Sequence, residues 1–121
     1  MCSDLTEFWN EYVERCGFVL RDGGILEVPN VHENPQEGFR IAPEVILEHE
    51  GKVAATWHTH PHHGANLSVE DYQCFLRWPE WGHFIVHRGK VQYYYVEQNR
   101  VLCHASDIPR LPEKPLPGGA A

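Results

Sequence analysis

One apolar segment near the middle of the chain limits the fold more than any other feature. Residues 52–58, KVAATWH, are rich in apolar and β-branched residues, which favour a strand inside a sheet. Pro61 follows shortly afterwards and cannot take part in regular strand pairing. The sequence therefore predicts a central strand that runs into His58–His60 and ends there.

The patterns around this strand predict an α+β domain. Apolar side chains recur at the spacing of one helix face near the N-terminus, and Pro43 and Ser68 suit the starts of two further helices. The helices are expected at residues 5–13, 43–50 and 68–78, and further strands at residues 16–21, 25–29, 83–88, 91–97 and 101–104, with a short one at 39–41. The expected fold is a mixed β-sheet flanked by two or three helices.

The whole-chain properties exclude several classes of protein. The 121 residues fit one domain, residues 1–104, followed by a Pro/Gly-rich tail or linker at 105–121. A net charge of −7 argues against a protein that binds nucleic-acid phosphates. No apolar run approaches the roughly 18 residues of a membrane span, and no signal peptide is recognisable. The 4 cysteines lack the spacing of a disulfide framework, so we expect a reduced, cytoplasmic protein.

The segment HTHPHHGANLSVED, residues 58–71, concentrates groups that bind metal ions. His58 and His60 share one face of the predicted strand, with Cα atoms roughly 6.5 Å apart. Ser68 and Asp71 share one face at the start of the next helix. Two histidines and one carboxylate leave a tetrahedral ion one open position, which is typical of a catalytic zinc site. The same donors also suit iron or nickel.

A catalytic site of this kind needs a carboxylate that transfers protons from the attacking water to the leaving amine. Spacing along the chain does not choose it, because several glutamates qualify: Glu14, Glu27, Glu44, Glu48 and Glu70. Helical phase turns Glu70 away from Ser68 and Asp71. Glu14 comes just before the strand at residue 16, where it could lie beside the metal.

The same residues resemble a known family. HTHP, six further residues and SVED look like the H-x-H-P-x(6)-S-x-x-D motif of the JAMM (MPN+, or JAB-domain) zinc metalloproteases. The stretch VERCGFVL is similar to the second signature of that family, a glutamate shortly before the glycine that opens the first strand. The resemblance implies His58, His60 and Asp71 as zinc ligands, Glu14 as general acid/base, and Ser68 as the residue that stabilises the oxyanion.

The resemblance also implies a fold, an activity and a setting. The family fold is cytidine-deaminase-like, and its members hydrolyse peptide or isopeptide bonds, often near the C-terminus of ubiquitin or a ubiquitin-like protein. The compact spacing here looks like that of bacterial and phage members, which resemble the amino-terminal part of a phage tail assembly protein. The expected partner is a protein or peptide substrate, in a bacterial host cytoplasm or associated with a virion.

Other interpretations of these residues stay open. A polar loop with an ordinary Ser68 cap would explain Ser68 but not two histidines at the end of an apolar strand. A non-catalytic MPN-like scaffold with a structural metal would explain the ligands without any reaction. A small-molecule metallohydrolase, releasing amino acids or amines from conjugates, would use the same site.

Three smaller features complete the expectations. His62 and His63 are expected as exposed residues at the rim of the site, although extra metal ligands would have the same residue type. The tyrosines at residues 93–95 alternate faces in a strand, so at least one should be exposed. The Gly-Gly near the end of the tail is shared with ubiquitin-like proteins, but a flexible linker is the simpler interpretation.

Overall fold

A computed structural model describes residues 5–62 and 64–103 of the chain. The expected tail, His63 and His104 lie outside these residues. The helical elements are the 3-10 turn η1 (Leu5–Phe8), helix α1 (Pro43–His49), the 3-10 turn η2 (Glu50–Lys52) and helix α2 (Val69–Arg77). The strands are β1 (Cys16–Leu20), β2 (Ile25–Val28), β3 (Val53–Thr59), β4 (Gly82–His87), β5 (Lys90–Glu97) and β6 (Arg100–Cys103).

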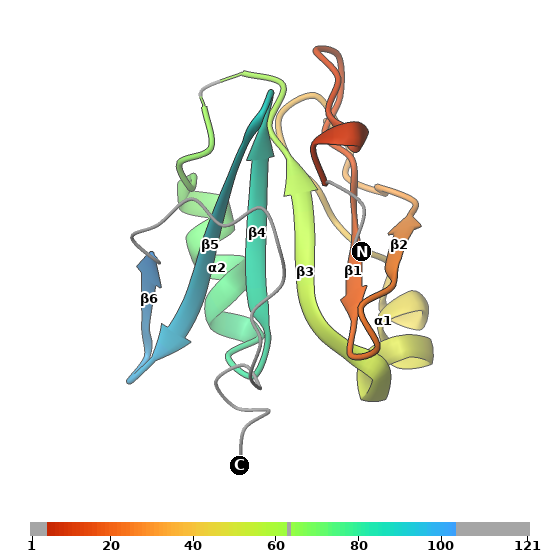
Figure 1. Ribbon diagram of the computed structural model, residues 1–121, viewed down its shortest axis with the longest axis vertical. Coiled ribbons are helices and arrows are strands. Elements are labelled where there is room, and N and C mark those ends of the chain that lie inside the picture. Colours follow the sequence, from red (N-terminus) through yellow and green to blue (C-terminus); the bar gives the residue numbers. More distant parts are fainter. Residues whose placement is uncertain (1–4, 63, 104–121) are drawn as a thin grey trace.

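The strands form one six-stranded sheet in the order β2-β1-β3-β4-β5-β6 (Figure 1). Strands β3 and β4 pair in parallel, and the other neighbouring pairs are antiparallel. Helix α2 supplies the crossover between the two parallel strands. The predicted α+β fold with a mixed sheet is therefore confirmed, and the predicted central strand is β3.

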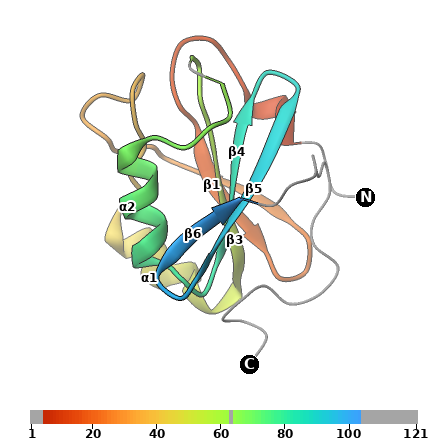
Figure 2. The same cartoon turned by 90° about the vertical axis from the view of Figure 1, so that its left-hand side faces the viewer.

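Both faces of the sheet are covered. Figure 2 shows α1 and α2 on one face and η1 on the other. On the η1 face, Leu5 packs with Trp57 and Tyr93, and on the α2 face Phe75 packs with Tyr94. Tyr95 is partly buried against the η1 face, so the prediction of an exposed tyrosine at residues 93–95 is wrong. Because elements pack on both faces of the sheet here, all three tyrosines are at least partly buried.

The predicted opening helix over residues 5–13 is also wrong, because the helical turn ends at Phe8. The side chain of Asn10 accepts hydrogen bonds from the backbone N–H groups of Tyr12 and Val13, at 2.8 and 2.9 Å. Such a local bond competes with helix formation. Leu5 still packs on the sheet, whereas Tyr12 is 71% exposed, so the apolar spacing reflects packing of the first residues only.

The short strand expected at residues 39–41 does not form either. These residues belong to the loop between β2 and α1, and their backbone bonds to the beginning of that loop instead of to a strand. The Arg40 N–H donates to the side chain of Asn30, and the Arg40 carbonyl accepts from Val31. The apolar residues nevertheless have partners, since Ile41 is buried in the core and the Phe39 ring stacks on His58.

Two expectations about the whole chain can be compared with the described residues. Cys16, Cys74 and Cys103 form no disulfide, as the spacing of the cysteines predicts. In the described part of the chain, each helix is too short or too polar to cross a lipid bilayer.

Candidate metal centre

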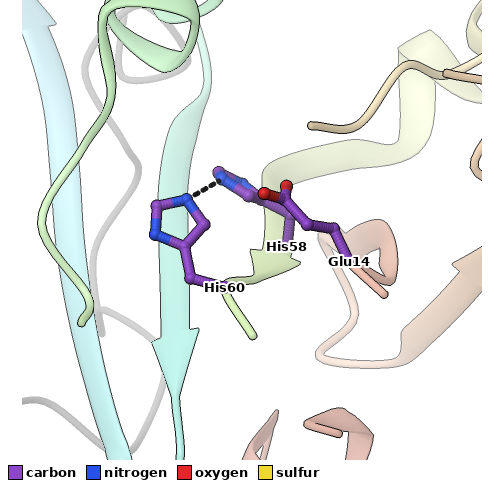
Figure 3. Close-up of side chains that lie close together, drawn as sticks. All are labelled: Glu14, His58 and His60. Carbon is purple, nitrogen blue, oxygen red and sulfur yellow. Dashed lines mark hydrogen bonds between the residues drawn. The ribbon is translucent and has the colours of Figure 1, made fainter. Parts of the chain in front are cut away.

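The site lies where strand β3 ends. His58 and His60 point to the same side of the sheet, and their Nε2 atoms are 3.1 Å apart (Figure 3). Both side chains are buried, at 0% and 6% exposure. Phe39 stacks on the His58 ring with 4.2 Å between ring centres, and the edge of Phe75 packs nearby. The two predicted histidines therefore converge on one buried point.

Helix α2 brings a carboxylate to the same point. Ser68 caps the helix: its hydroxyl accepts the Asp71 N–H at 3.1 Å, and Asp71 Oδ2 accepts the Ser68 N–H at 3.0 Å. This reciprocal capping box fixes the Asp71 side chain. Its two oxygens then lie 3.1 Å from His58 Nε2 and 3.0 Å from His60 Nε2. All three side chains that the sequence suggests as metal ligands are thus in mutual contact.

Strand register brings Glu14 close to the two histidines. Cys16 pairs with His58 across β1 and β3, so Glu14, two residues earlier, faces His60. Glu14 is 6% exposed, and its carboxylate offers an atom within 4.8 Å of ligand atoms of both histidines (Figure 3). The buried group of Glu14, His58 and His60 could therefore bind a metal ion.

The other candidate carboxylates lie elsewhere. Glu27 forms an ion pair with Arg15 at 2.7 Å. Glu44 and Glu48 are exposed on α1. Glu70 is exposed and contacts His32 at 3.1 Å. Of the five glutamates that qualify by sequence, the structure places Glu14 against the histidines.

The hydrogen bonds around His60 require either a proton or a metal ion at this point; burial opposes the protonated ring, but Asp71 raises its pKa overall. Its Nδ1 lies 3.0 Å from the carbonyl oxygen of Gly64, which can only accept, so Nδ1 carries the proton. The Nε2 atom of a neutral His60 then presents a lone pair to Asp71 Oδ2, another lone-pair atom, at 3.0 Å. Two acceptors repel at this distance unless a proton or a metal ion lies between them.

The spacing of the donor atoms fits a small metal ion. Ligand atoms placed about 2.0–2.1 Å from a tetrahedral ion lie about 3.3–3.4 Å apart. The two histidine Nε2 atoms are 3.1 Å apart, and Asp71 places a different oxygen 3.0–3.1 Å from each of them, slightly closer than that. Two imidazoles and a carboxylate are also the donor types that zinc prefers. The Nδ1 atom of His58 is buried without a hydrogen-bond partner among the described residues, so the usual outer-shell partner of a ligand is missing there.

Burial and charge shift the acidity of these groups in opposite directions. Burial raises the pKa of Glu14 to about 8, and the carboxylates of Asp71 and Glu70 add to this rise, while His60 opposes it. Burial would also raise the pKa of Asp71, but the two histidines and the Ser68 N–H hold it well below its usual value. Burial lowers the pKa of His58, although Asp71 opposes that shift. One carboxylate is therefore kept ionised, while the other exchanges a proton near neutral pH.

A pocket of about 630 Å³ opens beside the histidines. Its walls include Glu14, Gln36, Glu37, His60, Pro61, His62, Asn66, Leu67 and Ser68. Ser68 is exposed here, and its bond to the Asp71 N–H uses an acceptor lone pair, which leaves its O–H able to donate. His62 is exposed at the rim, as expected from the sequence.

Several residues that support the site carry no signal in the sequence. The His60 carbonyl accepts hydrogen bonds from Trp9 Nε1 and His87 Nδ1, both at 2.8 Å. Asn30 Nδ2 donates to the Glu14 carbonyl at 2.9 Å. These partners lie up to 51 residues apart in the chain, so local spacing gives no indication of them.

Comparison with known proteins adds support for the fold. No family model and no curated protein matches the sequence. Among solved structures, the chain is similar to the solution structure of protein DSY2949 from Desulfitobacterium hafniense, with a TM-score of 0.53 and 20% sequence identity. The similarity covers 76% of this chain and 75% of that one. At this identity, the match bears on the fold and not on the activity.

Proposed function

We propose that the chain is a zinc-dependent metallopeptidase of the JAMM type, with the corresponding cytidine-deaminase-like fold. The observation that carries the proposal is the convergence of His58, His60 and Asp71 on one buried point, with the Glu14 carboxylate facing it. The reaction is hydrolysis of a peptide or isopeptide bond in a protein substrate, such as a ubiquitin-like protein or a phage tail protein.

The proposed ligands are His58, His60 and Asp71, and they leave a fourth position for water. Three protein ligands and an open position are characteristic of a catalytic site, whereas a structural site is closed by a fourth protein ligand. The pocket beside His60 would let solvent and substrate reach an ion held by these residues. Zinc would supply Lewis acidity, which lowers the pKa of a water molecule and polarises a carbonyl group.

The residues of the chain would move the protons. Glu14 takes a proton from the attacking water and delivers it to the nitrogen that leaves. Burial raises the pKa of Glu14 to about 8 in the metal-free protein, and the charge of a zinc ion would lower it from there toward the neutral range that suits an acid/base. Glu14 Oε1 is buried and lacks a hydrogen-bond partner among the described residues, so it is available for this transfer.

Ser68 would donate its O–H to the oxygen that becomes negative as the tetrahedral intermediate forms. The capping bond with Asp71 holds the hydroxyl at the wall of the pocket. Removing one such donor typically costs on the order of 100- to 1,000-fold in kcat. The substrate would enter the open pocket as an extended segment of chain.

The proximity of Glu14 to the histidines favours one alternative. If Glu14 were a fourth metal ligand, the site would be closed, and the protein would be a non-catalytic scaffold with a structural metal. The two functions differ in what Glu14→Gln does. If Glu14 is the general acid/base, the variant loses activity and keeps its zinc. If Glu14 is a ligand, the variant binds zinc more weakly.

The experiment compares the wild-type protein with Glu14→Gln and with Glu37→Gln. Glu37 lines the same pocket from an exposed position and serves as the matched control. Zinc content and hydrolysis of peptide and isopeptide panels are measured together. We expect wild-type cleavage that a chelator abolishes and zinc restores, with a loss of about 100- to 10,000-fold in Glu14→Gln at unchanged zinc content. Zinc binding without cleavage of either panel would instead support the scaffold.

A further inference from the structure

The loop between β2 and α1 is organised by one side chain. Residues 30–38, here called the strap, begin with Asn30, whose amide makes four hydrogen bonds. Its Nδ2 donates to the carbonyls of Glu14 and Gly38, at 2.9 and 3.0 Å. Its Oδ1 accepts the N–H groups of His32 and Arg40, both at 3.0 Å. Two donors and two lone pairs are the full capacity of an amide side chain.

The strap holds the backbone of Glu14 at both of its polar groups. The Glu14 N–H donates to the Pro35 carbonyl at 2.7 Å, and the Glu14 carbonyl accepts from Asn30. Glu14 lies two residues before the start of β1, outside the sheet. The bonds to the strap therefore take the place of the hydrogen bonds that a strand residue forms with its neighbouring strands. The place of the Glu14 carboxylate therefore depends on the strap.

The strap is also tied to the helix that carries Asp71. His32 Nδ1 accepts the Asn34 N–H at 2.9 Å, so Nε2 carries the proton that is shared with Glu70 Oε2 at 3.1 Å. The strap thus connects the segment before β1 with the first turn of α2, which are the two elements that flank the histidines.

We propose that Asn30 is a positioning residue for Glu14. By binding the Glu14 and Gly38 carbonyls together, its amide fixes the strap and so sets the distance from the Glu14 carboxylate to His58 and His60. The assignment of a catalytic consequence rests on the function proposed above, whereas the structural part does not.

The test uses Asn30→Asp, which keeps the shape and both acceptor contacts of Oδ1 but replaces the donor NH₂ with an oxygen. Two carbonyls would then face an acceptor. Asn10→Asp is the matched control, because the Asn10 side chain acts as an acceptor for two N–H groups in a nearby loop, and aspartate retains that role. Should Asn30→Asp fail to fold, Asn30→Ser serves as the second variant. Serine lacks the NH₂ group that donates to both carbonyls, and it places no negative charge against them.

The first readout is hydrogen exchange at the Glu14 amide, which requires no activity. We expect exchange to be faster by about 10-fold or more in the Asn30 variant, the factor that corresponds to roughly one lost hydrogen bond. Asn10→Asp should leave the exchange rate unchanged. An unchanged Glu14 amide in a folded Asn30→Asp or Asn30→Ser protein would overturn the proposal.

The second readout is kinetic. We expect kcat to fall by about 10- to 100-fold with KM and zinc content retained, as is typical when a partner behind a functional group is lost. In a Glu14→Gln background, the Asn30 change should cause no further loss, because the residue acts through Glu14. A full additional loss in that background would contradict positioning. If the wild-type protein cleaves nothing, the peptidase function fails, and the exchange measurement still decides the role of Asn30.

Discussion

The Oδ2 atom of Asp71 lies 3.0 Å from Nε2 of His60. The capping box at the start of α2 holds Asp71, and His60 directly follows the end of β3. The contact joins the two elements that the chain connects through residues 61–68. Because both atoms are buried acceptors when His60 is neutral, the contact is favourable only with a proton or a metal ion between them.

Asp71→Asn should separate the metal-binding role of this residue from its structural role. Asparagine still accepts the Ser68 N–H, so the helix cap should persist. Without the negative charge, zinc affinity should fall by more than the roughly 10- to 100-fold that loss of an outer-shell partner costs. Competition with a zinc chelator measures the affinity. Glu70→Gln, one residue away and exposed, is the control that should retain it.

Gly17 should be needed for the close pairing of β1 with β2, and β1 is the strand that follows Glu14. A Cβ atom at Gly17 would lie 2.0 Å from the Leu26 carbonyl oxygen and 2.8 Å from Trp57 Nε1. Strands β1 and β2 would have to move apart, so Gly17→Ala should cost about 1–3 kcal/mol of unfolding free energy or more. Gly51→Ala, where a Cβ meets open space, should stay within about 0.5 kcal/mol. Urea unfolding of both variants makes the comparison, and equal midpoints would refute it.

His83 should make the stability of the protein depend on pH. The ring is fully buried, accepts from Thr56 and donates to the Trp78 carbonyl, and burial lowers its pKa to about 3. The unfolded chain takes up a proton near pH 6.5, while the folded chain does not. Its contribution is therefore complete above about pH 6.5 and declines toward pH 3, by up to about 1.4 kcal/mol per pH unit.

The measurement for His83 is the unfolding free energy of the metal-free wild type and of His83→Gln between pH 3 and 8. Because glutamine does not titrate, the difference between the two proteins isolates the histidine. The wild type should lose its advantage as the pH falls through this window. Parallel stability curves would show that the burial of His83 does not govern this dependence.

The His60 carbonyl should depend on its two side-chain donors. Trp9→Phe keeps the ring on the sheet and removes one hydrogen bond, at a cost of about 1 kcal/mol. Removing His87 as well should cost more than the sum of the single changes, because the carbonyl then loses both donors. Thermal unfolding of the two single variants and the double variant tests this, and strict additivity would exclude the shared role.

The sequence predicts the parts of the site that are local in the chain. His58, His60, Ser68 and Asp71 lie within one strand end, one loop and one helix start, so their spacing implies their proximity. Glu14 is different: its place depends on the register between β1 and β3. No spacing in the sequence distinguishes it from the other glutamates, and it was the family resemblance that singled it out.

The errors in the predicted fold have one local and one long-range cause. The apolar spacing at residues 5–13 is compatible with a helix, but the Asn10 side chain captures the N–H groups that would continue it. The exposed tyrosine expected at residues 93–95 is missing because η1 covers the second face of the sheet. Neither the turn nor this coverage can be recognised from the periodicity of the segment itself.

The most direct test of the account is the zinc content of the purified protein after zinc is supplied and excess removed. We expect about one zinc ion per chain in the wild type and in Glu14→Gln, and none in His60→Ala. Zinc lost from Glu14→Gln as well would make Glu14 a ligand and the site a closed, structural one. A wild-type protein that binds no metal would contradict the central claim and leave the buried histidines paired through a proton.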